Sequence, residues 1–568
     1  MSSRVLATPS GVSLAFSARV SSSASRSRAP LALVDGGVTV DRRVAAFPRA
    51  RAATVLLEGA RSAPRRASAR LVRRLAPPRA ASLAPGDPPS SDVDAVDPNL
   101  RALVLVACLS MLAFGAATGA IAGALLFLER GTSLGHLTVA AKSAVVAATP
   151  LGALVGAATL APRVARARGR RFALLLADGL YLVAALAMAT AHTHRQLTFG
   201  RALAGVAVGV STSLSALYIS ECAPARARGR LSSLAPLAGT SGILLSYLAS
   251  LALRDVAGGW RLMLALCAVP AVAQLALGRY LVESPRWLAE RGRASDARRA
   301  LVALGQPDAD PSTFVRTSDV AAVASSDWRV LWRPKYRRAT TAAVGLNLLQ
   351  QLCGINVVVY FAPAILSDAG FDRSASIALT AGVGALQIAC GARLSAVIDR
   401  VGRRPAALWG IVGLGAGLAC LAAGATTATT ATMAAAASTS ASASTSTSAV
   451  AAKWIAVVGI LIYRLSFSCS LGPVPYVVAA EVFPNEVRAS GAAAATAAQW
   501  AANAVVTGSF LSLVGALGPT RTWCAYLVVC VAAWFAVSAV LPETKGRSLE
   551  SMGEEEERDD RGRVTFRE

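Results

Sequence analysis

The chain has 568 residues, of which 54% are hydrophobic and only 16% are charged, and its formal net charge is +25 at pH 7. This composition excludes an ordinary soluble fold and indicates that lipid is part of the solvent. Apolar stretches close to the ~20 residues that cross a bilayer predict twelve transmembrane helices. They lie at about 101–128, 139–161, 172–191, 197–219, 231–253, 260–281, 339–361, 375–398, 405–424, 454–478, 492–514 and 523–541.

The first element in chain order is a basic leader, residues 1–95. Residues 1–86 hold fifteen arginines and three acidic residues, so about half of the excess positive charge lies there. The leader is rich in Arg and Ser and has no sustained apolar core, which is typical of an organelle transit peptide and not of a secretory signal. We predict the plastid inner envelope as the membrane, with a mitochondrion second. The alternatives are another organelle or the plasma membrane. The alternative interpretation of the leader itself is a disordered, arginine-biased tail. Basic residues are not interleaved with aromatic ones, so no nucleic-acid partner is expected.

The spans fall into two groups of six, which predicts an all-α membrane protein. Residues 96–282 are expected to form an N-terminal bundle and residues 339–541 a C-terminal bundle. An arginine-rich linker with short helices joins them over 283–338, and a tail follows over 542–568. The lipid bilayer is therefore an expected partner.

The two halves repeat one pattern. Residues 201–229 and 463–491 each end an apolar run in Glu, with Arg seven residues further on. Each half also carries a basic glycine turn, at 168–171 and at 399–404. Internal repeats of this kind are typical of transporters.

The short loops differ in charge. Loops after spans two, four and eight are rich in arginine, and the opposite loops are poor in it. Positively charged loops resist transfer across the membrane, so these loops, the linker and both termini are predicted to share the inner face. Residues 423–449 are almost entirely Ala, Ser and Thr, and we predict a low-complexity outer loop there.

Residues that serve enzymes are scarce. Three histidines and nine cysteines show no zinc or redox spacing, so no metal site and no cofactor are expected. No paired carboxylates or nucleophile–base set lies within the predicted spans, which argues against an enzyme.

Polar side chains inside the spans mark the predicted pathway, because each costs several kcal/mol of lost hydration unless it meets a partner or a wet cavity. Two sets stand out, one in span seven and one in span eleven: Gln350, Gln351, Asn356 and Tyr360, then Gln499, Trp500 and Asn503. The first set is predicted to share one half of a helix surface. Amides that both donate and accept, beside a flat indole, suit a neutral hydroxyl-rich ligand. The alternative role is hydrogen bonding between helices.

Seven motifs in chain order resemble the sugar porter family of the major facilitator superfamily, in the manner of its plastidic glucose transporters, over about residues 101–550. They are GlyArg at 200–201, TyrIleSerGlu at 218–221 with ArgGly at 228–229, GluSerProArgTrpLeu at 283–288, GlnGlnLeuCysGlyIleAsn at 350–356, AspArgValGlyArgArg at 399–404, GlyProValProTyr at 472–476 with Glu481 and Arg488, and ProGluThrLysGlyArgSerLeuGlu at 542–550. The resemblance implies two pseudo-symmetric six-helix bundles that rock about a central monosaccharide site. It places Gln350, Gln351, Asn356, Gln387, Trp500 and Asn503 at the sugar-facing positions.

The same resemblance implies a conformational latch of charged residues at the inner face. Its members are Arg201, Glu221, Arg228, Asp399, Arg403, Arg404, Glu481 and Arg488. Ion pairs of modest individual strength can together hold one state by a few kcal/mol and still release it. Static anchoring at the membrane interface is the alternative. Arg166 stands where the family usually has Asp, which predicts a weaker latch in the first half.

Several positions depart from the family's pattern. Ala116 and Ala117 leave span one without a titratable group, which favours downhill uniport of a hexose over proton symport. Pro236, Gln387 and Ser468 replace the family's usual Gln, Asn and Glu, and so alter the expected pocket. A sugar sensor without net flux shares the motifs, but only about 18 residues follow Glu550, which favours transport.

Overall fold

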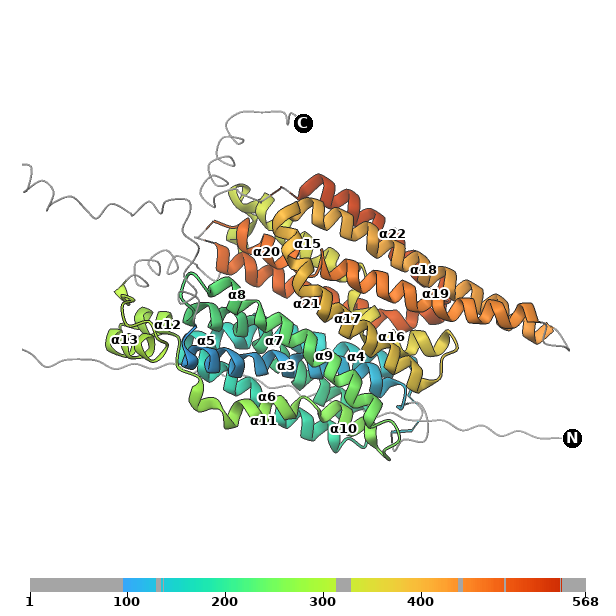
Figure 1. Ribbon diagram of the computed structural model, residues 1–568, viewed down its shortest axis with the longest axis horizontal. Helices are drawn as coiled ribbons and strands as arrows, with labels where there is room; N and C mark the ends of the chain where they lie inside the picture. Colours follow the sequence, from blue (N-terminus) through green and yellow to red (C-terminus); the bar gives the residue numbers. More distant parts are fainter. Residues whose placement is uncertain are drawn as a thin grey trace, which may run out of the picture. The chain divides into compact units, whose positions relative to one another are not determined.

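The computed structural model describes residues 96–128, 134–135, 137–312, 328–437, 443–484, 487–541 and 543. The predicted leader up to residue 95, the middle of the linker at 313–327 and the tail beyond 543 lie outside the described residues. The described part is helical (Figure 1). Eleven of its helices are long and apolar enough to cross a membrane, or twelve if one bent pair counts as a single span.

Six spans build the N-terminal bundle. They are α3 (Pro98–Leu125); α4 (Val139–Val155), which continues through the π-helical turn η2 (Gly156–Leu160) into α5 (Ala161–Arg168); α6 (Arg170–Ala189); α7 (His194–Cys222); α8 (Arg228–Ser232) with α9 (Leu234–Ala252); and α10 (Gly259–Ala265) with α11 (Ala268–Ala276). The last two helices form the bent pair, with an angle of 42° between them. A short 3-10 turn, η3 (Gly278–Tyr280), then leads to α12 (Pro285–Glu290) and α13 (Ala294–Ala303), which lie in the linker.

The C-terminal bundle repeats the plan. Its elements are η4 (Trp328–Trp332), α15 (Pro334–Leu352), α16 (Ile355–Asp368), α17 (Arg373–Val401), α18 (Arg403–Ala437), α19 (Ala443–Ser468), α20 (Val474–Glu481), α21 (Arg488–Leu517) and α22 (Pro519–Val540). The helical architecture therefore confirms the predicted fold class.

Small residues let the helices of each bundle approach closely. On α7, a Cβ at Gly205 would lie 2.1 Å from the Thr149 carbonyl oxygen of α4. A Cβ at Gly209 would lie 2.2 Å from the Ala153 oxygen of the same helix. Close backbone approach of this kind is how helices associate where burial from water gives no driving force.

The two bundles meet along three helix pairs, α4 with α21, α9 with α17 and α3 with α16. Tyr247 of α9 donates its hydroxyl to the Val359 carbonyl of α16 at 2.9 Å. Phe114 of α3 meets the edge of Trp500 of α21, with ring centroids 6.4 Å apart. The amide-bearing helices therefore border the opposite bundle.

Span seven is broken, which corrects the expectation of one continuous helical face. Gly354 separates α15 from α16 and has a φ of 94°, a conformation that favours glycine. The Tyr463 hydroxyl donates to the freed Cys353 carbonyl at 2.8 Å. Gln350 and Gln351 therefore lie before the break and Asn356 and Tyr360 after it.

The predicted outer loop at 423–449 is also wrong, because α18 continues to Ala437 and α19 begins at Ala443. Alanine is the strongest helix former. Threonine hydroxyls bond to carbonyls four residues back, as Thr426 does to Ala422 at 2.9 Å and Thr432 to Ala428 at 2.9 Å. The threonines at 426–432 thus satisfy their hydroxyl groups within the helix.

Candidate functional site

Three amides at the break between α15 and α16 form a hydrogen-bonded chain. Asn356 donates its Nδ2 to Gln351 Oε1 at 2.5 Å, and Gln351 donates its Nε2 to Gln350 Oε1 at 3.0 Å. Gln350 in turn donates to the Leu471 carbonyl, in the turn between α19 and α20, at 2.5 Å. The break at Gly354 is what turns Asn356 back toward Gln351. Gln350 and Gln351 are buried, and Asn356 is partly exposed.

The second set of polar residues lies on α21. Gln499 donates to the Tyr476 hydroxyl of α20 at 2.6 Å. Asn503 is buried, its Oδ1 has no hydrogen-bond partner, and its side chain interacts with Tyr360 of α16. Trp500 faces Phe114 of the opposite bundle. The structure therefore links the two predicted sets through Tyr360 and Asn503, close to the border between bundles.

Gln387 lies on α17 and accepts a hydrogen bond from Arg464 of α19, with Nε and Oε1 2.7 Å apart. Arg464 is not among the residues predicted from the sequence. A lone arginine in the middle of an apolar span is the signal that identifies it, because ionisable residues at that depth are rare and mark functional sites.

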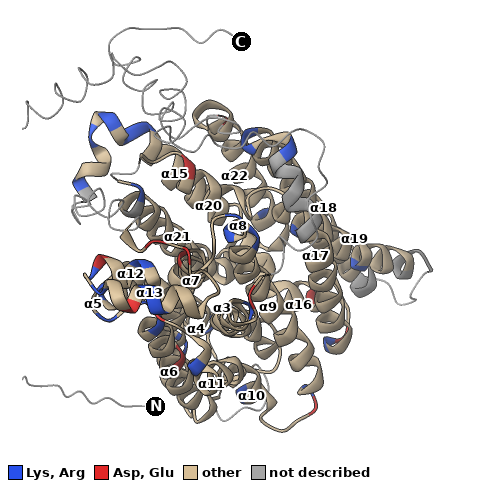
Figure 2. Ribbon diagram, turned by 60° about the vertical axis from the view of Figure 1, so that its left-hand side comes forward, with Lys and Arg blue, Asp and Glu red and all other residues tan. Residues whose placement is uncertain are grey.

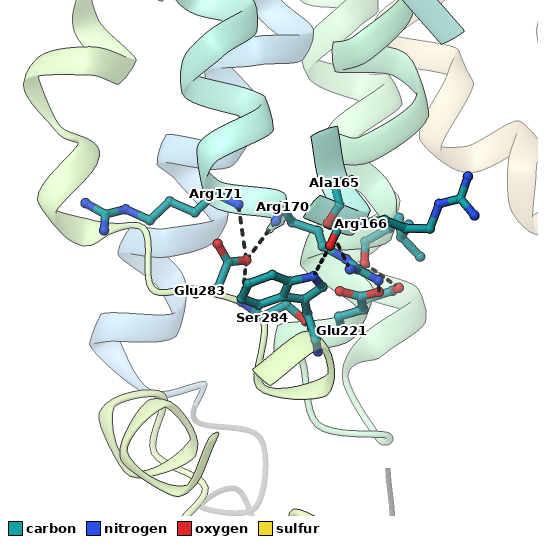
Figure 3. Close-up of polar contacts among 10 residues, drawn as sticks. Ala165, Arg166, Arg170, Arg171, Glu221, Glu283 and Ser284 are labelled. Atoms are coloured by element: carbon teal, nitrogen blue, oxygen red, sulfur yellow. Dashed lines mark hydrogen bonds and ion pairs between the residues drawn. The ribbon is translucent and has the colours of Figure 1, made fainter. Parts of the chain in front are cut away.

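The inner end of the N-terminal bundle holds a network around one arginine turn (Figure 3). Arg170, at the start of α6, pairs with Glu221 of α7 at 2.9 Å. Glu283 of the linker accepts from the backbone N–H groups of Arg170 at 2.8 Å and Arg171 at 3.3 Å. A carboxylate at a helix N-terminus also meets the positive end of the helix dipole. Glu283 thus fixes the linker to α6.

The C-terminal bundle has the equivalent network. Arg403, at the start of α18, pairs with Glu481 of α20 at 3.0 Å. Glu543 accepts from the backbone N–H groups of Arg403 at 3.0 Å and Arg404 at 3.1 Å. The Arg404 side chain donates to the Ser538 carbonyl of α22 at 2.8 Å. Both ion pairs join helices of one bundle.

Glycine is required at both arginine turns. Gly169 and Gly402 have φ values of 94° and 106°. A Cβ would lie 2.2 Å from Glu283 Oε2 at the first position and 2.6 Å from Glu543 Oε2 at the second. The basic glycine turns recognised in the sequence therefore work by letting a carboxylate approach the helix N-terminus.

The linker adds further contacts at the N-terminal network. Trp287 of α12 donates its indole N–H to the Arg166 carbonyl at 3.1 Å. Burial raises the pKa of Glu290, which lies near Arg170 and Glu221. A cavity of about 600 Å³ lies between α6 and the helices α12 and α13, and it is lined by Arg171, Glu283 and Trp287 among others. Basic residues gather around α5, α8, α12 and α13 (Figure 2).

Some predicted latch residues lie elsewhere or make other contacts. Arg201 is buried near the opposite end of α7 from Glu221, about 30 Å away along the helix axis. It donates to the Ala117 carbonyl of α3 at 2.8 Å and so belongs to the bundle core, which corrects its placement at the inner face. Arg228 and Arg488 donate to backbone carbonyls of Ser220 and Phe483 within their own bundles. The side chain of Asp399 lies outside the described residues.

The sequence analysis omitted Arg170, Glu283 and Glu543 from the network. The repeat itself contains the signal for Arg170, since GlyArgArg at 169–171 matches GlyArgArg at 402–404. Glu283, two residues before Pro285, and Glu543, directly after Pro542, stand in motifs that were quoted only for the resemblance. Nothing in the spacing relates either carboxylate to a helix more than a hundred residues earlier.

Comparisons with known proteins identify the family. The model of the family described as "Sugar (and other) transporter" matches residues 103–555. The chain is 33% identical to a D-xylose transporter of Levilactobacillus brevis over 78% of this chain and 93% of the relative. It is 32% identical to plastidic glucose transporter 4 of Arabidopsis thaliana over 79% of this chain and 78% of the relative.

Solved structures agree with this assignment. The xylose transporter XylE from E. coli, in a partially occluded inward-open conformation, superposes with a TM-score of 0.66. The match has 26% identity and covers 80% of this chain and 100% of XylE. The chain therefore belongs to the sugar porter family of the major facilitator superfamily.

Proposed function

We propose that the chain carries a monosaccharide, a hexose first, across a membrane by alternating access between the two bundles. The family consists of transporters and not of enzymes, and the relatives include proteins named for xylose and glucose transport. The observation that supports the proposal most is the chain of amides Gln350, Gln351 and Asn356, together with Asn503, whose Oδ1 is unpartnered. These groups can exchange their mutual bonds for bonds to sugar hydroxyls.

The experiment is uptake of labelled monosaccharides into liposomes that contain the purified chain. We expect saturable uptake that reaches equilibrium and is competed by unlabelled sugar. Protein-free liposomes set the background, and flux no higher than that background for every monosaccharide tested would exclude a carrier. A sensor without net flux would bind sugar and give this same negative result.

Transport is proposed to be downhill uniport. Support comes from Ala117, which stands at the span-one position where the family resemblance places the proton-accepting acid of proton-coupled members; its carbonyl accepts from Arg201 at 2.8 Å. Because the alanine at this position cannot take up a proton, a pH difference across the membrane should not drive accumulation of the sugar. We expect the internal sugar concentration to stop at the external one in two conditions: without a pH difference, and with the outside about one pH unit more acidic than the lumen.

Proton symport remains the second candidate because of one residue. Asp178 of α6 is fully buried and neither of its carboxylate oxygens has a hydrogen-bond partner. A buried carboxyl group can carry a coupling proton. Accumulation of sugar above its external concentration, driven by the pH difference and lost in Asp178→Asn, would establish symport instead of uniport.

The inner-face networks are proposed to act as the latch of the outward-open state. Arg170 with Glu221 and Arg403 with Glu481 hold the inner ends of their bundles in defined positions. Their side chains are largely buried but retain 7–28% exposure, so solvent screening moderates each pair and the two together suit a carrier that must cycle. Arg201 is not included in this proposal.

The membrane is proposed to be the plastid inner envelope. Support comes from the composition of residues 1–86 and from the plastidic relative. Residues 1–90 fused to a fluorescent protein are expected to direct it into plastids of leaf cells, because an Arg- and Ser-rich leader is sufficient for import. A reporter that stays in the cytosol or enters mitochondria would contradict this address, and the same fusion with its arginines changed to glutamine serves as the control.

A further inference from the structure

Arg464 is a buried cation without a counter-charge. It lies within α19, and its side chain is 1% exposed. Its Nε donates to Gln387 Oε1, whereas its Nη1 has no hydrogen-bond partner. Among the residues that the structure describes, it makes no ion pair. A buried guanidinium in this situation is far less stable than one that meets an anion.

Gln387 places this cation beside the border of the two bundles. Gly384, one turn earlier on α17, packs against Leu244 and Tyr247 of α9 in the N-terminal bundle. Residues three apart on a helix lie on the same face, so Gln387 is on the side of α17 that looks toward the opposite bundle. The Gln387–Arg464 pair therefore adjoins the pathway proposed for the substrate.

The hydrogen bonds that are already made decide what this pair can offer a ligand. The carboxamide oxygen of Gln387 is occupied by Arg464. What remains are the Nε2 hydrogens of Gln387 and the Nη1 and Nη2 hydrogens of Arg464, all of them donors. A hydroxyl can accept from them, but a carboxylate accepts at both oxygens and also neutralises the charge.

A second buried arginine adds positive potential. Arg201 is 1% exposed on α7, the helix of the first half that corresponds to α19, and its Nη2 has no partner. Its other guanidinium nitrogens donate to carbonyls of Ala117 and Val145. Its charge also interacts with Tyr360 of the C-terminal bundle. Each half of the molecule thus holds a buried cation, and that of the first half lies in the core of its own bundle.

We infer that the Gln387–Arg464 pair binds a carboxylate and that the preferred substrate is a monosaccharide acid, such as a hexuronate. The inference rests on the proposed function of a monosaccharide carrier and deepens it. The amides of α15, α16 and α21 bind the hydroxyls of the sugar, and Arg464 binds its carboxylate. A carboxylate brings one negative charge to this one guanidinium, whereas a phosphate group brings close to two, so a sugar monoacid is favoured over a sugar phosphate.

The test compares D-glucuronate with D-glucose. Glucuronate carries a carboxylate at the position where glucose carries a hydroxymethyl group. Wild-type protein in liposomes is expected to take up glucuronate at least about tenfold faster than glucose at low concentration, because charge-assisted bonds are the stronger ones. Arg464→Gln is expected to abolish this preference, so that the variant's own glucuronate and glucose rates lie within about threefold of each other. Arg464→Lys keeps the charge and should retain part of the preference. The control is Arg254→Gln, which removes an exposed arginine that pairs with Asp255.

Each outcome has one meaning. Faster uptake of glucose than of glucuronate by the wild type, or the same glucuronate preference in wild type and Arg464→Gln, would overturn the inference and leave the carrier intact. Glucose 6-phosphate that competes better than glucuronate would overturn the carboxylate assignment. Absence of flux for all three compounds would remove the proposed function and the inference with it. The wild-type comparison stands even if Arg464→Gln does not fold.

Discussion

Replacing Gln350 with alanine is expected to lower monosaccharide uptake about tenfold or more, because at least one hydrogen bond in a buried site then lacks its partner. Gln350 is 2% exposed and is the fixed end of the amide chain. Without it, Gln351 loses its acceptor and the Leu471 carbonyl loses a donor. An unpaired buried group costs about 1–3 kcal/mol, and that loss falls on the positions where sugar hydroxyls are expected. Initial rates of uptake into liposomes measure the effect.

The same helix supplies a matched control. Asn347 of α15 is also buried, but it donates to the Ala343 carbonyl of its own helix at 2.9 Å. Asn347→Ala removes an amide of similar burial without touching the chain that crosses the break. We expect its uptake to stay within about threefold of the wild type. Equal losses in Gln350→Ala and Asn347→Ala would show that buried amides serve packing here and not the sugar.

Replacing Arg170 with alanine is expected to shift the carrier toward its inward-open state about tenfold or more, since the pair with Glu221 is only slightly exposed and a carboxylate is left behind. The side chains of Arg170 and Glu221 are 12% and 7% exposed. Solvent screening reduces the penalty below that of a fully buried pair, to about 1–3 kcal/mol. Under the proposed latch, this penalty falls on the outward-open state, in which the inner ends of the two bundles are held closed.

Distances between genetically encoded spin labels report the shift. Labels at Ala225 and Val401 sit on exposed inner ends of the two bundles. We expect the long-distance population to grow in Arg170→Ala and to remain at the wild-type level in Arg254→Ala, which breaks an exposed ion pair. An unchanged distance distribution in Arg170→Ala would assign the network to static anchoring at the membrane interface.

The number of spans was predictable from sequence, because a long apolar stretch satisfies its backbone hydrogen bonds in lipid by forming a helix. The two-bundle fold was predictable from the repeated motifs of the two halves. The break in span seven was not. The sequence around Gly354 predicts one continuous helix. In the structure the backbone of Gly354 has a positive φ, and Tyr463 and Tyr526 pack around the break. This break determines how Gln351 and Asn356 meet.

Composition misled the prediction for residues 423–449. Low complexity was taken as evidence against folding, but alanine and threonine extend α18 by about three and a half turns beyond the expected end of span nine. The charged residues show a different limit. Arg403 and Glu481 were placed correctly near each other, and the repeat identifies Arg170, whereas the depth of Arg201 follows only from its carbonyl partners on neighbouring helices.

The most direct measurement of the central claim is a structure of the carrier in lipid with its transported monosaccharide bound. We expect the sugar between the two bundles, with its hydroxyls within hydrogen-bonding distance of Gln350, Gln351 and Asn356 and its ring beside Trp500. A sugar bound elsewhere, with these amides still bonded only to one another, would contradict the account.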